Sequence, residues 1–329
     1  MAGNLTIRNA LLLSALFFLI CFGLGYPILN RYDPGKVPGT YDASVYCAEV
    51  TGTLSIASYR PFVPALAKPF YWIAKGRIAT WNPALFGMLM ATSLLTAATA
   101  TVIIAIGLRS QCPYSTSLVA ALLFLVNFAV PNWNLAAYVD SGEALFLALI
   151  TWSLLSARWY LLPLWAIPGT LSKETFAPFA VVFVFTWWIK ERPLRARNLV
   201  WGLALTFLAG AAVLLSFSSG TNFLRGAPKY AAEMADYSKV GFIAALLGNF
   251  TAREFWYTFI WLLPVGLIRL RQMDRRWLWS TATTLLLAIL FGAYDNALGN
   301  TSRALFNIAG PLLSISAAAY LTDSKSQMP

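Results

Sequence analysis

The chain has 329 residues, of which 59% are hydrophobic and only 11% are charged, and its net charge is +11. A soluble domain usually carries about 25% charged residues, so this composition excludes an ordinary soluble protein. The chain contains no histidine, which excludes Ser–His–Asp hydrolases, zinc enzymes with histidine ligands, and phosphatases or acyltransferases that depend on a catalytic histidine.

Apolar runs of about 20 residues recur along the chain, which is the length that crosses a hydrocarbon core of roughly 30 Å. We therefore predict an all-α fold, a polytopic transmembrane helical bundle that forms a single domain over 1–329. The first run is expected to stay in the protein as a span, because no small-residue cleavage site follows it. The predicted spans number about ten and cover 10–26, 80–108, 115–133, 142–157, 159–171, 176–189, 199–217, 254–268, 277–293 and 304–321. The segment 159–171 carries Pro163 and Pro168, and a kinked span and a pair of half-helices remain alternatives there.

The charges between the spans predict an orientation. With the N-terminus inside, the cytoplasmic loops hold 12 basic and three acidic residues, a net charge of +9, which leaves +2 for the other face. Short cytoplasmic loops rich in Lys and Arg follow the positive-inside rule. Topology thus explains the positive charge. The sequence contains no basic soluble module of the kind that would indicate a nucleic-acid partner.

Two long loops are expected on the extracytoplasmic face, at 27–79 and 218–253. The first contains a short acidic segment, Tyr41 to Glu49, and an aromatic and apolar segment, Arg60 to Lys75. The second segment is typical of a helix that lies in the membrane interface, with Tyr71 and Trp72 at the level of the lipid headgroups. The loop 218–253 is long enough to act as a lid over a site.

Asp42 is the leading candidate for a catalytic residue. It lies between Tyr41 and Tyr46, and Glu49 shares its face if the segment is helical. A carboxylate beside an apolar bundle can serve as a general base. A helix N-cap or a solvated loop acid explains Asp42 equally well, so both interpretations remain open.

Asp140 and Glu143 stand at the outer end of the fourth span. Their spacing fits an N-cap and the third-position acid of a capping box. Glu143 also begins an apolar helix, where a charge is costly without a partner. Capping and function are therefore both open for this pair.

Three basic residues are candidates for binding an anion. Lys173 lies in a short turn between two spans, where it could contact a phosphate, whereas Glu174 is assigned to the favourable first turn of the following helix. Arg303 opens the last span, where it opposes the helix dipole unless it binds an anion. A snorkelling anchor is the alternative for Arg303. Arg225 adds a donor in the second long loop.

The arrangement of these residues resembles the GT-C class of integral-membrane glycosyltransferases. The resemblance rests on Tyr41-Asp42 in the first outer loop, on the interfacial segment from Arg60 to Lys75, on Asp140, and on the basic positions Lys173 and Arg303. Members take a sugar from a polyprenyl-phosphate or dolichyl-phosphate carrier. Many of them have paired acids in the first loop, whereas Asp42 has no adjacent acidic partner.

The resemblance implies an inverting enzyme in which Asp42 is the general base and Lys173 and Arg303 bind the lipid phosphate. The candidate residues are, for catalysis, Asp42 and Asp140 and, for substrate binding, Lys173, Arg303, Arg225, Glu143, Tyr41 and Tyr46. The expected partners are a polyprenyl-phosphate-linked sugar donor, an acceptor of unknown identity and membrane lipids. No cofactor is expected, although Asp42 with Asp140 leaves a divalent metal as an alternative. The expected location is a bacterial inner membrane, with the site on its extracytoplasmic side.

Two other functions fit the sequence. A transporter or flippase of an anionic, polyprenyl-linked lipid needs charged or broken spans near the membrane midplane, whereas the charges here cluster at the ends of spans. A non-catalytic subunit of a membrane complex needs no carboxylate for activity. The cluster of acids on one face favours chemistry over both.

Overall fold

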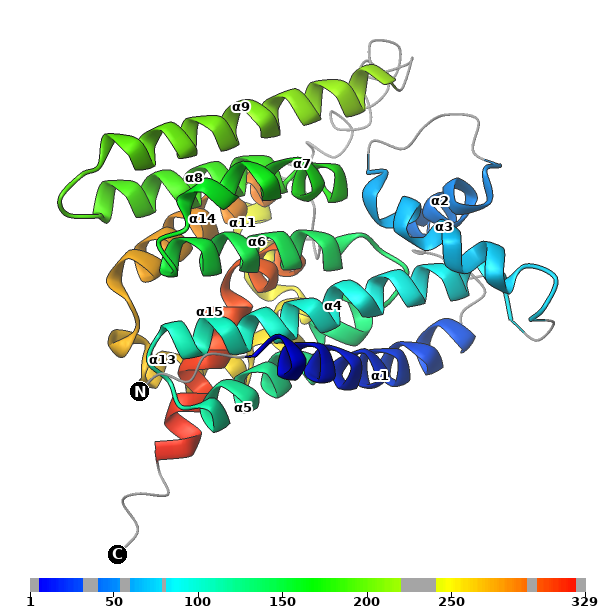
Figure 1. Cartoon of the computed structure of the whole chain (residues 1–329), viewed down its shortest axis with the longest axis horizontal. Coiled ribbons are helices and arrows are strands. Elements are labelled where there is room, and N and C mark those ends of the chain that lie inside the picture. The colour runs from blue at the N-terminus through cyan, green and yellow to red at the C-terminus, as the bar shows by residue number, and fades with distance from the viewer. Residues whose placement is uncertain are drawn as a thin grey trace, which may run out of the picture.

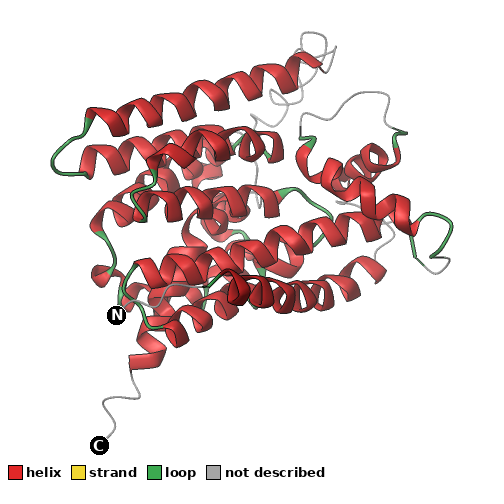
Figure 2. Cartoon of the chain, viewed as in Figure 1, coloured by secondary structure: helices red, strands yellow, loops and turns green. Residues whose placement is uncertain are grey.

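The protein is a helical bundle. Its structure, a computed structural model, describes residues 6–31, 41–53, 60–78, 81–219, 241–294 and 301–323. All regular elements within these ranges are helices (Figure 2). The α-helices are α1 (Ile7–Arg31), α2 (Tyr41–Thr51), α3 (Phe62–Ala74), α4 (Pro83–Arg109), α5 (Tyr114–Leu125), α6 (Asp140–Leu155), α7 (Leu162–Ser172), α8 (Phe176–Lys190), α9 (Ala196–Ser219), α11 (Phe242–Thr251), α12 (Arg253–Phe259), α13 (Leu262–Ile268), α14 (Arg275–Tyr294) and α15 (Thr301–Asp323).

Five of the described helices are long and apolar enough to cross a membrane: Ile7–Leu29, Pro83–Arg109, Ala196–Ser216, Arg275–Ala293 and Thr301–Thr322. They differ in how deeply they are buried. The most apolar stretches of α4 and α15 are 67% and 78% buried, against 17% for α1 and 28% for α9. Consequently α4 and α15 form the centre of the bundle, and α1 and α9 turn apolar side chains outward, as lipid-facing helices do.

Helices α1, α4, α6, α8 and α9 run along a common direction, with connections at two ends of the bundle (Figure 1). The helices α2 and α3 lie together at one end, on the right of Figure 1, and the connection between α8 and α9 lies at the other end. Helix α3 packs against α4, where Gly87 lets the backbone of Tyr71 come close. The start of α4 is stabilised at two positions. The N-cap residue Asn82 accepts a hydrogen bond from the backbone of Ala84 at 2.9 Å, and Pro83, the first residue of the helix, fixes the first turn.

Several predicted spans are interrupted. The predicted span 115–133 consists of α5 and a separate π-helix, η1 (Val130–Asn134), which contains Pro131. The predicted span 254–268 consists of α12 and α13, which are separated at Ile260 and Trp261. Backbone groups at such breaks need partners inside the protein. Asn127 supplies one at the end of α5, where its Nδ2 donates to the carbonyl of Thr258 at 2.9 Å.

The structure also bears on the two long predicted loops, one of which it corrects. Residues Phe242–Thr251 of the predicted loop 218–253 form α11, because their apolar side chains pack against α14. The predicted segment Arg60–Lys75 does contain a helix, α3. Only part of its predicted aromatic edge faces outward, since Trp72 is 67% exposed whereas Tyr71 is 7% exposed and packs against α4. The position of α3 in a membrane interface stays a prediction.

Candidate functional site

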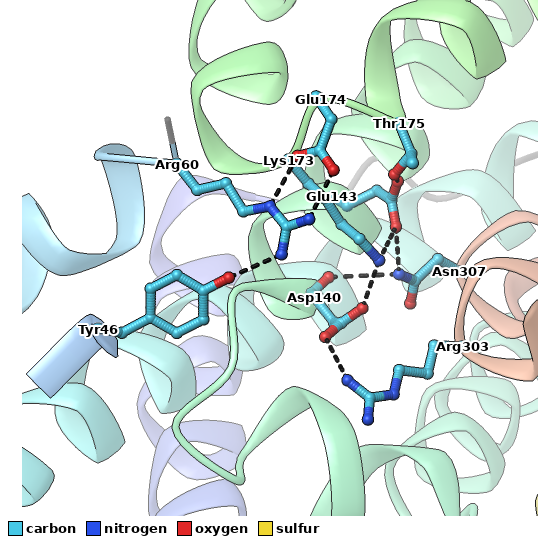
Figure 3. Close-up of polar contacts among 9 residues, drawn as sticks. All are labelled: Tyr46, Arg60, Asp140, Glu143, Lys173, Glu174, Thr175, Arg303 and Asn307. Atoms are coloured by element: carbon cyan, nitrogen blue, oxygen red, sulfur yellow. Dashed lines mark hydrogen bonds and ion pairs between the residues drawn. The ribbon is translucent and has the colours of Figure 1, made fainter. Parts of the chain in front are cut away.

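The candidate site lies at the end of the bundle that carries α2 and α3. There the start of α6, the turn between α7 and α8, and the start of α15 come together, and Arg60, two residues before α3, reaches them from one side (Figure 3). The side chains that interact are Tyr46, Arg60, Asp140, Glu143, Lys173, Glu174, Thr175, Arg303 and Asn307. They come from five separate parts of the chain, so the site exists only in the folded bundle.

Lys173 joins the turn between α7 and α8 to the start of α6. Its Nζ donates to Asp140 Oδ1 at 2.7 Å and to Glu143 Oε2 at 3.3 Å. All three side chains are buried, at 13%, 3% and 0% exposure. Burial lowers the pKa of Lys173, but the two carboxylates raise it more, so the net change is upward. Lys173 therefore carries its charge as the counterion of two acids.

Glu143 has two further partners, both neutral. The Thr175 hydroxyl donates to Oε1 at 2.5 Å, and Asn307 Nδ2 donates to Oε2 at 2.8 Å. Asn307 lies in the second turn of α15 and is 2% exposed. Glu143 thus ties α6 to α8 and α15 through contacts that satisfy a buried carboxylate.

Gly142 allows the turn after α7 to approach α6. A Cβ atom at this position would lie 2.7 Å from Ser172 Cβ and 3.3 Å from Val63 Cγ2. Any side chain there would push Ser172, and with it Lys173, away from Asp140. The absence of a side chain at Gly142 therefore sets the spacing between α6 and α7 on which the ion pair depends.

Arg60 forms a second ionic connection beside the first. Its Nε and Nη2 donate to the two carboxylate oxygens of Glu174 at 2.7 and 2.5 Å, and its Nη1 donates to the Tyr46 hydroxyl at 2.7 Å. Burial raises the pKa of Glu174, but Arg60 lowers it more, so the net change is downward. This two-point geometry is specific to Arg. It fastens α2, the residue before α3, and the turn between α7 and α8 to one another.

Arg303 is held more loosely than the other two cations. Its Nη1 lies 3.8 Å from Asp140 Oδ2, beyond hydrogen-bond distance. Its guanidinium stacks over the ring of Tyr138 at 4.5 Å and faces that of Trp133 at 5.8 Å. Its Nε is buried and has no hydrogen-bond partner among the described residues. The availability of Arg303 to an anion therefore rests on its terminal nitrogen Nη1, which Asp140 does not hold in a hydrogen bond.

A cavity of about 220 Å³ lies among these groups. Its lining includes Arg60, Lys173 and Arg303, together with Phe291 of α14 and Asp42 of α2. Asp42 is exposed, and within the described ranges its carboxylate has no hydrogen bond or ion pair. Every other acid at this site is engaged with a cation. The cavity therefore presents one unengaged carboxylate and one loosely held guanidinium.

The structure excludes one of the two alternatives for Asp140 and Glu143, the capping of α6. Helix α6 begins at Asp140, its N-cap position is Val139, and no side chain caps it. The capping interpretation is therefore wrong for both residues. The physical reason is that a buried ammonium, Lys173, is within reach, and a charged partner stabilises a buried carboxylate better than backbone amides at a helix start. The sequence places Glu174 in the first turn of the following helix. In the structure it lies before α8 and is paired with Arg60.

The structure brings together most of the predicted residues: Asp42, Tyr46, Asp140, Glu143, Lys173 and Arg303. Tyr41 begins α2, but its side chain is not described, and Arg225 lies outside the described residues. Sequence reasoning missed the roles of Arg60, Glu174, Thr175 and Asn307. The acidic residue Glu174 next to Lys173 indicated that this turn takes part in a polar cluster. A single amide, Asn307, inside the last predicted span gave no such indication.

The described residues contain no group of three or more His, Cys, Asp or Glu side chains that could hold a metal ion. The Asp140 carboxylate is already paired with Lys173 and lies beside Arg303, which disfavours its use as a metal ligand together with Asp42. The expectation that no metal is required stays a prediction.

Comparisons with protein-family models, with curated proteins and with solved structures found no match to this chain. A function for the chain has to be inferred from the geometry and chemistry of its own site.

Proposed function

We propose that this protein is a membrane glycosyltransferase of the GT-C type. It transfers a sugar, with inversion, from a polyprenyl-phosphate carrier to an acceptor on the extracytoplasmic side of a bacterial inner membrane. Asp42 is its general base. The observation that carries the proposal is the lining of the 220 Å³ cavity, where an unengaged carboxylate, Asp42, and a loosely held cation, Arg303, share one space.

The reaction needs one base and one anion-binding group. Asp42 takes the proton from the acceptor hydroxyl as its oxygen bonds to the anomeric carbon. The bond between that carbon and the carrier phosphate breaks, and its electrons leave with the polyprenyl phosphate. Arg303 stabilises the charge that develops on the phosphate, and it can do so because its Nη1 lies 3.8 Å from Asp140 and is not held by it in a hydrogen bond.

Lys173 and Arg60 contribute to this site mainly as counterions. Each already has carboxylate partners within 3.3 Å. Their role is to hold α6, α8 and α2 around the cavity, and Lys173 adds positive charge near the phosphate. Asp140 orients Lys173 and Arg303, and Glu143 provides Lys173 with a second carboxylate partner. We therefore rank Arg303 above Lys173 as the phosphate ligand.

The proposed topology has about ten crossings. Five helices are long enough to cross alone, and the other crossings use shorter or broken helices: α5 with η1, α6, α7, α8, and α11 to α13. Support comes from Figure 1, in which the connection between α8 and α9 lies at the end opposite α2 and α3. The positive-inside rule makes the arginine-rich end cytoplasmic, so the site faces outward.

A transporter of an anionic, polyprenyl-linked lipid is the second candidate. The observation that favours it is the interruption of the chain between α12 and α13 and between α5 and η1, because transporters use broken helices near their substrate sites. The two functions differ in whether Asp42 is needed for chemistry.

The test is turnover of a panel of radiolabelled polyprenyl-phosphate sugars by purified protein, with membrane extract as the source of acceptors. Wild type is compared with Asp42→Asn, which keeps the shape of the side chain but removes the base. Asp274→Asn is the control, because Asp274 pairs with Arg276 and does not line the cavity.

We expect wild type and Asp274→Asn to consume a donor, and Asp42→Asn to be at least about a hundredfold slower with donor binding intact. Turnover by Asp42→Asn at the wild-type rate would remove Asp42 from the mechanism. Donor binding without turnover in all three proteins, together with movement of the lipid across proteoliposomes, would establish the transporter instead.

A further inference from the structure

A second and larger hollow lies away from the candidate site. It is a groove of about 770 Å³ lined by residues of α11 to α15. Its walls are almost entirely apolar and include Phe255, Leu263, Leu278, Ile289 and Leu312. The candidate site uses none of these residues.

The packing of the helices explains why the groove exists. Helices α12 and α13 pack against α15, and α14 packs against α11 and α15. Among these described helices, α13 and α14 do not pack closely against each other. The short loop around η3 (Leu270–Gln272) joins them at one end only, so the two helices enclose an open channel along α15. Leu267 and Trp279 line this channel and are about half exposed, at 51% and 52%, so it opens to the surface of the bundle.

The groove has a charged end. Arg271 and Arg275 line it beside η3, and both are exposed and have no carboxylate partner within the described ranges. The neighbouring Arg276 differs, because its guanidinium is paired with Asp274 at 2.6 Å. The two unpaired arginines stand at the arginine-rich end of the molecule, where Lys190 lies 4.6 Å above the ring of Trp279. Positive charge at this end makes it the cytoplasmic one.

The length of the groove fits one lipid chain. Along α14 its lining extends from Arg275 to Ile289, a rise of about 21 Å at 1.5 Å per residue. That is about two thirds of a hydrocarbon core of roughly 30 Å. A chain that enters from the cytoplasmic headgroup region would therefore lie in the groove past the midplane, with its headgroup beside the arginines.

We propose that this groove binds an anionic phospholipid of the cytoplasmic leaflet. Its phosphate contacts Arg271 and Arg275, and one of its acyl chains lies between α13 and α14. Charge complementarity selects an anionic headgroup over a zwitterionic one, and the apolar walls bind the chain. This site is separate from the site of sugar transfer and does not depend on it.

The test is retention of lipid by the purified full-length protein. The protein is reconstituted into bilayers that contain equal amounts of phosphatidylglycerol and phosphatidylcholine with identical chains, then extracted in detergent and analysed by native mass spectrometry. Four variants are compared with wild type. The double variant Arg271→Gln/Arg275→Gln removes the headgroup contacts, and Arg195→Gln/Arg197→Gln removes two exposed arginines at the same end but outside the groove.

The other two variants test the acyl chain. Ala282→Trp places a large side chain in the groove, and Leu286→Trp places one on the exposed side of α14 outside it. We expect wild type to retain phosphatidylglycerol at least about tenfold over phosphatidylcholine. Arg271→Gln/Arg275→Gln should lose this preference and Ala282→Trp should lose the bound lipid, with both controls like wild type.

Three results would overturn the proposal. The first is equal retention of the two lipids by wild type. The second is an equal loss of preference in the Arg195→Gln/Arg197→Gln control, which would assign the effect to net charge. The third is undiminished retention by Ala282→Trp, which would place the lipid elsewhere on the surface.

Discussion

Lys173 Nζ lies 2.7 Å from Asp140 Oδ1, although 33 residues separate them in the sequence. This contact joins the end of α7 to the start of α6, and it brings Arg303 of α15 to the other oxygen of the same carboxylate. The proposed site is therefore organised around a buried acid with two cations, and that organisation leads to the following predictions.

Replacing Lys173 with Met should strongly destabilise the protein. The change leaves Asp140 and Glu143 close together in the interior, with the loosely held Arg303 and the Glu174-bound Arg60 as the cations that remain near Asp140. Loss of one partner from a buried ion pair typically costs about 3–5 kcal/mol. Unfolding of the purified protein by SDS in mixed micelles measures the change. Arg77→Met, which removes an exposed cation, should leave the midpoint nearly unchanged, and equal midpoints for the two variants would contradict the prediction.

Arg60 and Glu174 should be energetically coupled. Each of Arg60→Gln and Glu174→Gln removes a charge-assisted, two-point interaction and should cost about 2 kcal/mol. The double variant should cost clearly less than the sum, because each single change already breaks the pair. A double-mutant cycle on the unfolding free energy measures the coupling. The exposed pair Arg253 and Glu254 provides the control cycle and should show much weaker coupling; strictly additive effects for Arg60 and Glu174 would refute the pairing.

Because of Glu174, the stability of the folded protein should depend on pH in the acid range. Burial raises its pKa, but Arg60 lowers it more, so the folded pKa lies below the ordinary value of 4.5. A depressed folded pKa adds stability above about pH 4.5, and this stability is lost as the pH falls through the folded pKa. We expect the difference in Tm between wild type and Glu174→Gln to be largest near pH 6 and to shrink below pH 4.5. A difference that stays constant down to pH 3 would contradict this assignment.

Gly142 should tolerate no side chain. Gly142→Ala places a Cβ 2.7 Å from Ser172 Cβ, and such overpacking typically costs about 1–3 kcal/mol. Gly210→Ala in α9 is the matched control, because nothing lies within 4 Å of its Cβ position. The control should be neutral or slightly stabilising. Gly142→Ala/Ser172→Gly should recover much of the lost stability, and failure of this rescue would place the strain elsewhere.

Much of the candidate site could be anticipated from the sequence, because ionisable residues next to apolar spans are rare and costly. Asp140, Glu143, Lys173 and Arg303 are noticeable for that reason. Their partners could not be assigned. The spacing of Asp140 and Glu143 matched a capping box as well as a buried ion pair, and local spacing contains no information about Lys173 on another helix. Asn307 was missed because a single amide within an apolar span resembles an ordinary packing residue.

By itself, the amino-acid sequence determined that the protein is a helical bundle with apolar segments long enough to cross a membrane, and where along the chain its charges lie. These properties follow from local composition, since each apolar run avoids water whatever segments lie next to it. Only the tertiary structure decided which helices are broken, which cation neutralises which acid, and that Asp42 alone among the acids lining the cavity remains unengaged. Those outcomes depend on contacts between residues far apart in the chain. The close approach of α6 and the end of α7, for example, requires that Gly142 has no side chain.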